Sequence, residues 1–185
     1  MEKERIRRLL SSRVPVRKAS PALTEASVLV PLFASDGASG PSVWLLRRSD
    51  DLRVHGGQVA LPGGKKDASD PTPLATALRE AHEEIGLEPE SVDVLGALDD
   101  YATGTGFVIT PYVGWIADGF VPKPLVTEVS RVFAVPLELF RGEPSIREYR
   151  DAQNNPKTSI SFEIGDETVW GLTAWVLRDL ACRLA

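Results

Sequence analysis

Apolar and polar positions alternate along this chain in patterns that predict strands, with a few segments of helical spacing between them. Short runs rich in Val, Leu and Trp predict strands at residues 25–34, 42–49, 91–101 and 106–117. The first two runs flank a turn-forming cluster at 35–41, so together they predict a β-hairpin. Residues 56–64 resemble a brief strand ending in a glycine turn, and residues 159–164 and 167–171 a second hairpin. Short helices are predicted at residues 2–10 and 136–142, and a final amphipathic helix at 172–185.

The clearest predicted helix covers residues 72–86. Thr72 is suited to the N-cap, Pro73 to the first helical position and Gly86 to the C-terminal cap. Counting about 100° per residue places four apolar side chains on one face, which we expect to pack on the core. These residues are Leu74, Leu78, Ala81 and Ile85.

Strands mixed with few helices predict an α+β fold with layered packing. The chain has 185 residues, 43% of them hydrophobic, and no internal repeat, so we expect one compact domain. Residues 1–24 are assigned to an N-terminal helix and connector, and residues 25–185 to the domain itself.

Charge and cysteine content exclude several classes of protein. The net charge of −5 argues against a protein that depends on nucleic-acid phosphates for affinity. No apolar stretch reaches membrane-spanning length, and the charged start lacks the apolar run of a secretory signal. We therefore expect a cytoplasmic protein that binds neither nucleic acid nor membrane. Cys182 is the only cysteine, which leaves no intrachain disulfide, and we expect it to be a small apolar residue near the C-terminal helix.

Three glutamates crowd one edge of the 72–86 helix. Glu80, Glu83 and Glu84 fall within an arc of about 100°, and Glu84 lies nearest the apolar face. Like charges at this spacing destabilise a helix, and its C-terminal dipole makes them less favourable still. One interpretation is a solvated acidic face with an Arg79–Glu83 pair; the other is a site for Mg²⁺ or Mn²⁺, which prefer oxygen ligands.

The segment "LPGGKKD" at residues 61–67 favours the metal interpretation. A glycine-rich loop just before the helix lets the backbone approach a ligand closely. Cations held by carboxylates bridge phosphate oxygens and activate water. The loop and the helix together suit phosphate chemistry.

Residues 64–87 resemble the signature box of the Nudix hydrolases, G-x5-E-x7-R-E-U-x-E-E-x-G-U, where U is a bulky apolar residue. The second half matches at Arg79-Glu80, Glu83-Glu84 and Gly86. Asp70 stands where the family has its first glutamate, and eight residues rather than seven separate it from Arg79. A ligand role for Asp70 is therefore left open.

Residues 45–64, "LLRRSDDLRVHGGQVALPGG", resemble the segment that precedes the box in the coenzyme A pyrophosphatase branch of this family. That branch also has the longer box. The pattern's first arginine aligns with Arg48 when Ser49 is the anchor, and Leu61 replaces its aromatic residue. Matching positions are Leu45, Leu46, Ser49, Arg53, Gly57, Pro62, Gly63 and Gly64.

The resemblance implies a Nudix fold, a mixed β-sheet core sandwiched between α-helices. It also implies Mg²⁺- or Mn²⁺-dependent hydrolysis of the diphosphate bond of coenzyme A or acyl-coenzyme A, giving 4′-phosphopantetheine and adenosine 3′,5′-bisphosphate. Two alternatives stay open: a Nudix pyrophosphatase for another nucleoside diphosphate derivative, such as ADP-ribose, or a non-catalytic nucleotide sensor. Homodimers are common in this family, so a homodimer is a further expectation.

Roles follow from the resemblance and the chemistry of each side chain. Glu80, Glu83 and Glu84 are the expected metal ligands, and with Arg79 they form the catalytic set. Arginine suits phosphate recognition, and a solvated charge is the alternative for each basic candidate. Gln58 either contacts substrate or caps a turn. Phe107 could stack on adenine, but we expect it to pack in the core, and we expect His82 to be structural or exposed. The identity of the general base is left open. The expected substrate-binding residues are Arg48, Arg53, His55, Gln58, Gly63 and Gly64.

Overall fold

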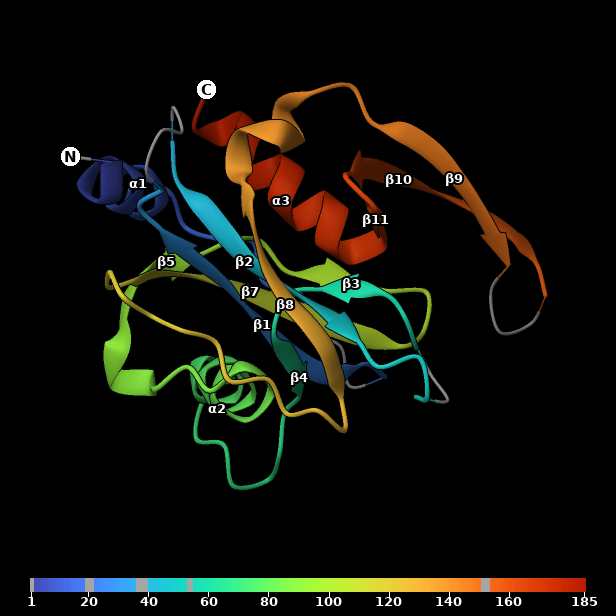
Figure 1. The fold of residues 1–185 in the computed structure, drawn as a ribbon, viewed down its shortest axis with the longest axis horizontal. Helices are drawn as coiled ribbons and strands as arrows, with labels where there is room; N and C mark the ends of the chain where they lie inside the picture. The colour runs from blue at the N-terminus through green and yellow to red at the C-terminus, as the bar shows by residue number, and fades with distance from the viewer. Residues whose placement is uncertain (1, 19–21, 36–39, 53–54, 151–153) are drawn as a thin grey trace.

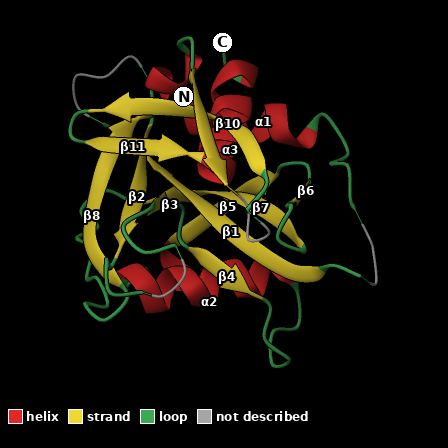
Figure 2. Cartoon of the chain, turned by 90° about the vertical axis from the view of Figure 1, so that its right-hand side faces the viewer, coloured by secondary structure: helices red, strands yellow, loops and turns green. Residues whose placement is uncertain are grey.

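The computed structural model describes residues 2–18, 22–35, 40–52, 55–150 and 154–185. A mixed β-sheet lies between helix α2 (Pro73–Ile85) on one face and helices α1 (Glu2–Ser11) and α3 (Gly171–Arg183) on the other (Figures 1 and 2). The described residues also form two short 3-10 helices, η1 (Pro89–Ser91) and η2 (Leu137–Arg141). The predicted α+β class, with a mixed sheet between helices, is confirmed.

The main sheet has the central order β3-β2-β1-β7-β5. β1 and β7 run parallel, with Thr24 beside Phe107, and the other described pairings are antiparallel. The strands of this sheet are β1 (Thr24–Phe33), β2 (Ser42–Arg48), β3 (Val59–Ala60), β4 (Gly63–Lys65), β5 (Val92–Ala97), β6 (Tyr101–Ala102), β7 (Phe107–Ile116) and β8 (Val129–Pro136). A second, antiparallel sheet contains β9 (Ser145–Arg150), β10 (Pro156–Ile164) and β11 (Glu167–Trp170), and in Figure 1 its β9–β10 hairpin extends from the body.

Both predicted hairpins are present: β1 pairs with β2, and β10 with β11. Strands β8 and β9 were not predicted. Every residue of β9 is exposed, and β8 carries an arginine and a serine among its exposed positions. Neither strand therefore has the buried alternation that identifies a strand in a sequence.

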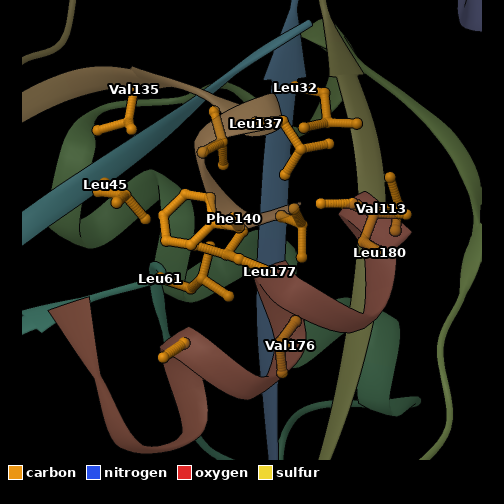
Figure 3. Close-up of a cluster of buried hydrophobic side chains, with 14 of the residues drawn as sticks. Leu32, Leu45, Leu61, Val113, Val135, Leu137, Phe140, Val176, Leu177 and Leu180 are labelled. Carbon is orange, nitrogen blue, oxygen red and sulfur yellow. The ribbon is translucent and has the colours of Figure 1, made fainter. Parts of the chain in front are cut away.

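Two apolar clusters occupy the two faces of the main sheet. Along β1, Leu29 belongs to the cluster beneath α2, whereas Val30 and Leu32 belong to the cluster beneath α3. This is the alternation expected of a strand buried on both faces. Figure 3 shows the α3-side cluster, in which Phe140 lies among Leu45, Leu137 and Leu177. Phe107, for which we expected core packing, is half-buried and belongs to neither cluster.

Helix α2 begins and ends as its sequence predicts. The Thr72 hydroxyl accepts a hydrogen bond from the Ala75 N–H at 3.1 Å, and Pro73 occupies the first turn. Gly86 adopts φ 70°, the left-handed conformation of a C-terminal cap, and its N–H bonds to carbonyls of the last turn.

The buried face of α2 differs from the predicted one. Ala77, Ala81, Glu84 and Ile85 are fully buried together with Thr76, whereas Leu74 and Leu78 are only half-buried. The small alanines lie against the sheet, so the helix is rotated from the leucine-centred face. A consequence is that Glu84 falls inside the buried arc.

The predicted glycine turn at 63–64 is instead the short strand β4, which pairs with β1 opposite Val28 and Ser27. A Cβ on Gly63 would lie 2.4 Å from the Ser27 carbonyl oxygen. Only glycine allows this close approach of two backbones.

The ends of the chain pack onto the same face of the sheet. Ile6 and Leu10 of α1 are buried in the α3-side cluster. Cys182 lies on α3, as its position predicts, but its side chain is exposed. No helix in the described residues is long and apolar enough to cross a membrane.

Candidate active site

Glu84 is the buried centre of the site, with only 3% of its surface exposed. Its Oε2 accepts a hydrogen bond from the Gly63 N–H at 2.9 Å, and its Oε1 lies 3.2 Å from the Arg48 guanidinium. Burial raises the pKa of Glu84 to about 7, helped by the charges of Glu80 and Glu128 and opposed by Gly63 and Arg48. The prediction that Glu84 is the glutamate nearest the apolar face is confirmed.

Glu80 lies one turn before Glu84 and faces the backbone of β4. A Cβ added to Gly64 would lie 2.6 Å from the Glu80 carboxylate, so the glutamate occupies space that glycine leaves open. Burial also raises the pKa of Glu80, while the nearby Arg79 lowers it. Gly63 and Gly64 are therefore positioned against two different glutamates of α2.

Arg79 joins the glutamates to the loop before the helix. Its Nε and Nη2 each lie 3.0 Å from a different oxygen of Asp70, forming a bidentate pair. Its Nη1 contacts Glu80 at 2.9 Å and Glu83 at 3.0 Å, and its Nη2 donates to the Lys65 carbonyl at 3.3 Å. Arg79 thus makes far more than a single surface ion pair.

Asp70 is held by these contacts. The Arg79 guanidinium keeps the pKa of this carboxyl well below its usual range, and the Asp67 N–H donates to the same group at 2.9 Å. Its side chain is only 5% exposed. Asp70 therefore holds Arg79 at the junction between the loop and helix α2. Its carboxylate is already occupied by these contacts.

The end of β2 is the second wall of the site. Arg47 and Arg48 point to opposite faces, so Arg48 contacts Glu84 while Arg47 pairs with Glu167. His55 Nδ1 lies 3.0 Å from the Gln58 side chain, and the Gln58 carbonyl accepts from the Arg48 N–H at 3.0 Å. These contacts bring Arg48, His55 and Gln58 together. Arg53 lies outside the described residues.

Glu128 lies in the segment just before β8 and was not among the site residues predicted from the sequence. Its charge acts on both Glu80 and Glu84, and its carbonyl accepts a hydrogen bond from the Ser49 N–H at 2.8 Å. The side chain is exposed. No motif marks this glutamate, because contacts distant in sequence bring it to α2: the pairing of β2 with β8, and the hydrogen bond from the Leu125 N–H to the Glu84 carbonyl at 3.1 Å.

The glutamate carboxylates of α2 are oxygen ligands of the kind that a hard divalent cation prefers. Among the described residues no three acidic, His or Cys side chains are gathered into a ready metal site, since Glu83 is turned to Arg79 and Glu84 to Arg48. Yet burial makes ionisation unfavourable for both Glu80 and Glu84, and neighbouring carboxylates add to this cost: Glu83 and Glu128 act on Glu80, and Glu80 and Glu128 act on Glu84. A cation near both would relieve that cost. His82, as expected, is exposed and faces Glu88 at 3.6 Å.

Comparison with known proteins agrees with this geometry. Residues 23–152 match the NUDIX domain. A protein from Pectobacterium atrosepticum, described as an uncharacterized Nudix hydrolase NudL, is 40% identical over 165 residues, or 87% of this chain and 83% of that one. A MutT/nudix family protein from Enterococcus faecalis has a similar fold, with TM-score 0.59 and 16% identity over 98% of this chain and 68% of that chain. DR0079 from Deinococcus radiodurans is similar with TM-score 0.57 and 17% identity, covering 88% of each chain.

The chain therefore belongs to the Nudix family. Nudix hydrolases are pyrophosphohydrolases of nucleoside diphosphate derivatives, and they generally need divalent metal ions. The predicted family and fold are confirmed by the domain match and the similar structures.

Proposed function

We propose that this enzyme hydrolyses the diphosphate bond of coenzyme A, and of acyl-coenzyme A, to 4′-phosphopantetheine and adenosine 3′,5′-bisphosphate. Residues 45–64 resemble the coenzyme A branch in sequence, and the observation that carries the proposal is the position of residues 45–52 and 55–64. Two residues of this segment, Arg48 and Gly63, contact Glu84 directly. The segment that suggests the substrate thus forms the wall of the glutamate site.

In this proposal Glu80 and Glu84 hold Mg²⁺ or Mn²⁺, with Glu83 as a third ligand. The cation would neutralise diphosphate oxygens and make a bound water more acidic. Arg79 keeps Glu80 and Glu83 oriented through its contacts at 2.9 and 3.0 Å. Because Arg79 is itself anchored by Asp70, the carboxylates stay in place when substrate enters.

Arg48 is the proposed contact to substrate phosphate, since its fork of N–H donors suits phosphate oxygens. Its side chain is 26% exposed beside Glu84, which leaves part of it open to a ligand. His55 and Gln58 are proposed to bind the same end of the substrate together with Arg53. The backbones of Gly63 and Gly64 supply a wall without side chains.

Glu128 is our proposed acceptor of the water's proton. Its exposed carboxylate has no ion-pair partner among the described residues, whereas Glu83 is engaged by Arg79. Its segment is bonded to α2, since the Leu125 N–H donates to the Glu84 carbonyl at 3.1 Å and the Glu128 N–H donates to the Leu125 carbonyl at 2.9 Å, and its charge acts on Glu80 and Glu84. A base at the open side of the site can exchange its proton with solvent.

The test is product identification. The enzyme is incubated with coenzyme A and Mg²⁺ or Mn²⁺, and the products are identified by mass spectrometry beside parallel reactions with acetyl-coenzyme A, ADP-ribose, a dinucleotide and dNTPs. We expect the two named products and the highest kcat/KM for coenzyme A or its thioester. If coenzyme A turns over slowest, the substrate assignment is wrong; if every substrate binds without turnover, the protein is a sensor and not an enzyme.

A further inference from the structure

A cleft of about 520 Å³ opens on the face of the sheet opposite the glutamate site. One wall is α3, and the others are the connector after α1 and the segment that joins β5 to β6. The two sites are separate because α2 and α3 pack against opposite faces of β1, through Leu29 and Val30 respectively (Figure 2). A cleft of this size accommodates a small-molecule ligand.

The first notable feature of the cleft is an exposed indole. Trp175 is 47% exposed although it lies on α3 between Ala174 and Val176, which are fully buried. Tyr101 lines the cleft from β6 and is half-buried. An indole exposed in a concave site offers a flat face on which a heterocyclic ring can stack.

The second feature is the charge of the cleft. Each aspartate that lines it forms an ion pair with at least one arginine. The Asp99 carboxylate also accepts from the Val16 N–H at 2.7 Å, and that of Asp100 from the Lys18 N–H at 2.9 Å, which fixes the connector in place. The ion pairs are Asp99 with Arg13 and Arg183, Asp100 with Arg17, and Asp179 with Arg183.

Two cations of the cleft remain without a carboxylate. Lys18 has no ion-pair partner among the described residues, and Arg178 donates only to the Gly142 carbonyl, at 3.3 Å. With the aspartates neutralised, these two side chains make the cleft attractive to an anion. Arginine and lysine beside an exposed indole are the groups that recognise a phosphate joined to a base.

We propose that this cleft is a second ligand site, which binds a purine nucleoside monophosphate or a ligand of the same chemistry. The base stacks on Trp175, and the phosphate lies between Lys18 and Arg178. The site is independent of the proposed substrate, because it shares no residue with the glutamate centre.

Cys182 provides a direct measurement of occupancy. It is the only cysteine of the chain, it is exposed, and it lines the cleft. The rate of its reaction with a chromogenic disulfide reagent is measured against increasing AMP, with adenosine and ribose 5-phosphate as probes that each lack one half. We expect AMP to slow labelling in a saturable way, and both half-probes to bind at least about tenfold more weakly.

Variants separate this site from the catalytic one. We expect Trp175→Ala, and Lys18→Ala combined with Arg178→Ala, to weaken protection by AMP about tenfold or more, while Trp175→Phe retains it. Glu84→Gln and Arg8→Ala, which lie outside the cleft, should leave protection unchanged. The proposal is overturned if millimolar AMP does not protect Cys182, if ribose 5-phosphate protects as well as AMP, or if protection survives Trp175→Ala but not Glu84→Gln.

Discussion

A guanidinium nitrogen of Arg48 at the end of β2 lies 3.2 Å from a carboxylate oxygen of the buried Glu84 on α2. The same glutamate accepts the Gly63 N–H from β4. One side chain of the helix is therefore tied to two different strands. The contact also gives Arg48 a position at the centre of the site, whereas its neighbour Arg47 is directed to the opposite face.

Removing this arginine should weaken substrate binding. We expect Arg48→Ala to raise KM by about 10- to 100-fold, because a charge-assisted contact to phosphate contributes about 1.5–3 kcal/mol. Steady-state kinetics with the best substrate measures it. Arg47→Ala is the matched control on the same strand, since Arg47 pairs with Asp50 and Glu167 instead. Equal increases in KM for both variants would contradict a phosphate-binding role for Arg48.

Glu84→Gln should abolish most activity and preserve the fold. The glutamine side chain has the size of glutamate and its amide oxygen can accept the Gly63 N–H, but it lacks the negative charge that a divalent cation requires. We expect kcat to fall by at least about 100-fold, the loss typical of removing a key charged group from an active site. His82→Gln on the exposed side of the same helix should be unaffected. Unchanged turnover in Glu84→Gln, with a native circular dichroism spectrum, refutes the metal assignment.

The raised pKa of Glu84 predicts how the metal-free protein responds to pH. The native carboxyl, with its pKa raised from an ordinary 4.5 to about 7, binds its proton more tightly than the unfolded chain does. Stability due to this group is thus full below about pH 4.5 and is lost as pH rises to about 7, by on the order of 2–3 kcal/mol. Urea unfolding with a chelator should show this loss between pH 5 and 8 in the native protein. The difference between the native protein and Glu84→Gln should change with pH in the same interval, and a constant difference would contradict the raised pKa.

The space beside Gly64 is reserved for Glu80. Gly64→Ala places a methyl group at 2.6 Å from the Glu80 carboxylate, which must then move. We expect metal affinity and kcat each to fall by about tenfold or more, because active-site groups tolerate displacements of only about 0.5 Å. Gly104→Ala is the control, since its added methyl group meets nothing within 4 Å. Calorimetric titration with Mn²⁺ measures the affinity, and identical values for the two variants would show that Glu80 does not need this space.

We expect Asp70 to contribute to stability and activity by holding Arg79 in place. Asp70→Asn removes the charged partner of a bidentate pair that is largely shielded from water, and we expect a loss of about 2–3 kcal/mol in unfolding free energy. Activity should fall as well, because Arg79 then no longer holds Glu80 and Glu83 in one arrangement. Chemical denaturation compared with Asp118→Asn, an exposed loop position, measures the effect. A loss no larger than that of the control would mean that Arg79 is anchored by other contacts.

Helix α2 and its acidic edge were predictable because their causes are local. The cap at Thr72, the left-handed Gly86 and the 3.6-residue period depend on neighbours within a turn or two. The same period placed Glu84 closest to the apolar face. The buried face of the helix was predicted less accurately. The prediction was centred on the larger Leu74 and Leu78, whereas the small Ala77 and Ala81 pack against the sheet.

By itself, then, the sequence determined the helix, its three neighbouring carboxylates, the family and the general α+β fold. Only the tertiary structure decided that Arg48 and not Arg47 faces Glu84, that Asp70 pairs with Arg79, and that the segment carrying Glu128 is bonded to α2. Each of these depends on strand pairing or on burial between segments far apart in the chain. Such contacts have no fixed spacing in sequence, so they appear only when the sheet has brought the segments together.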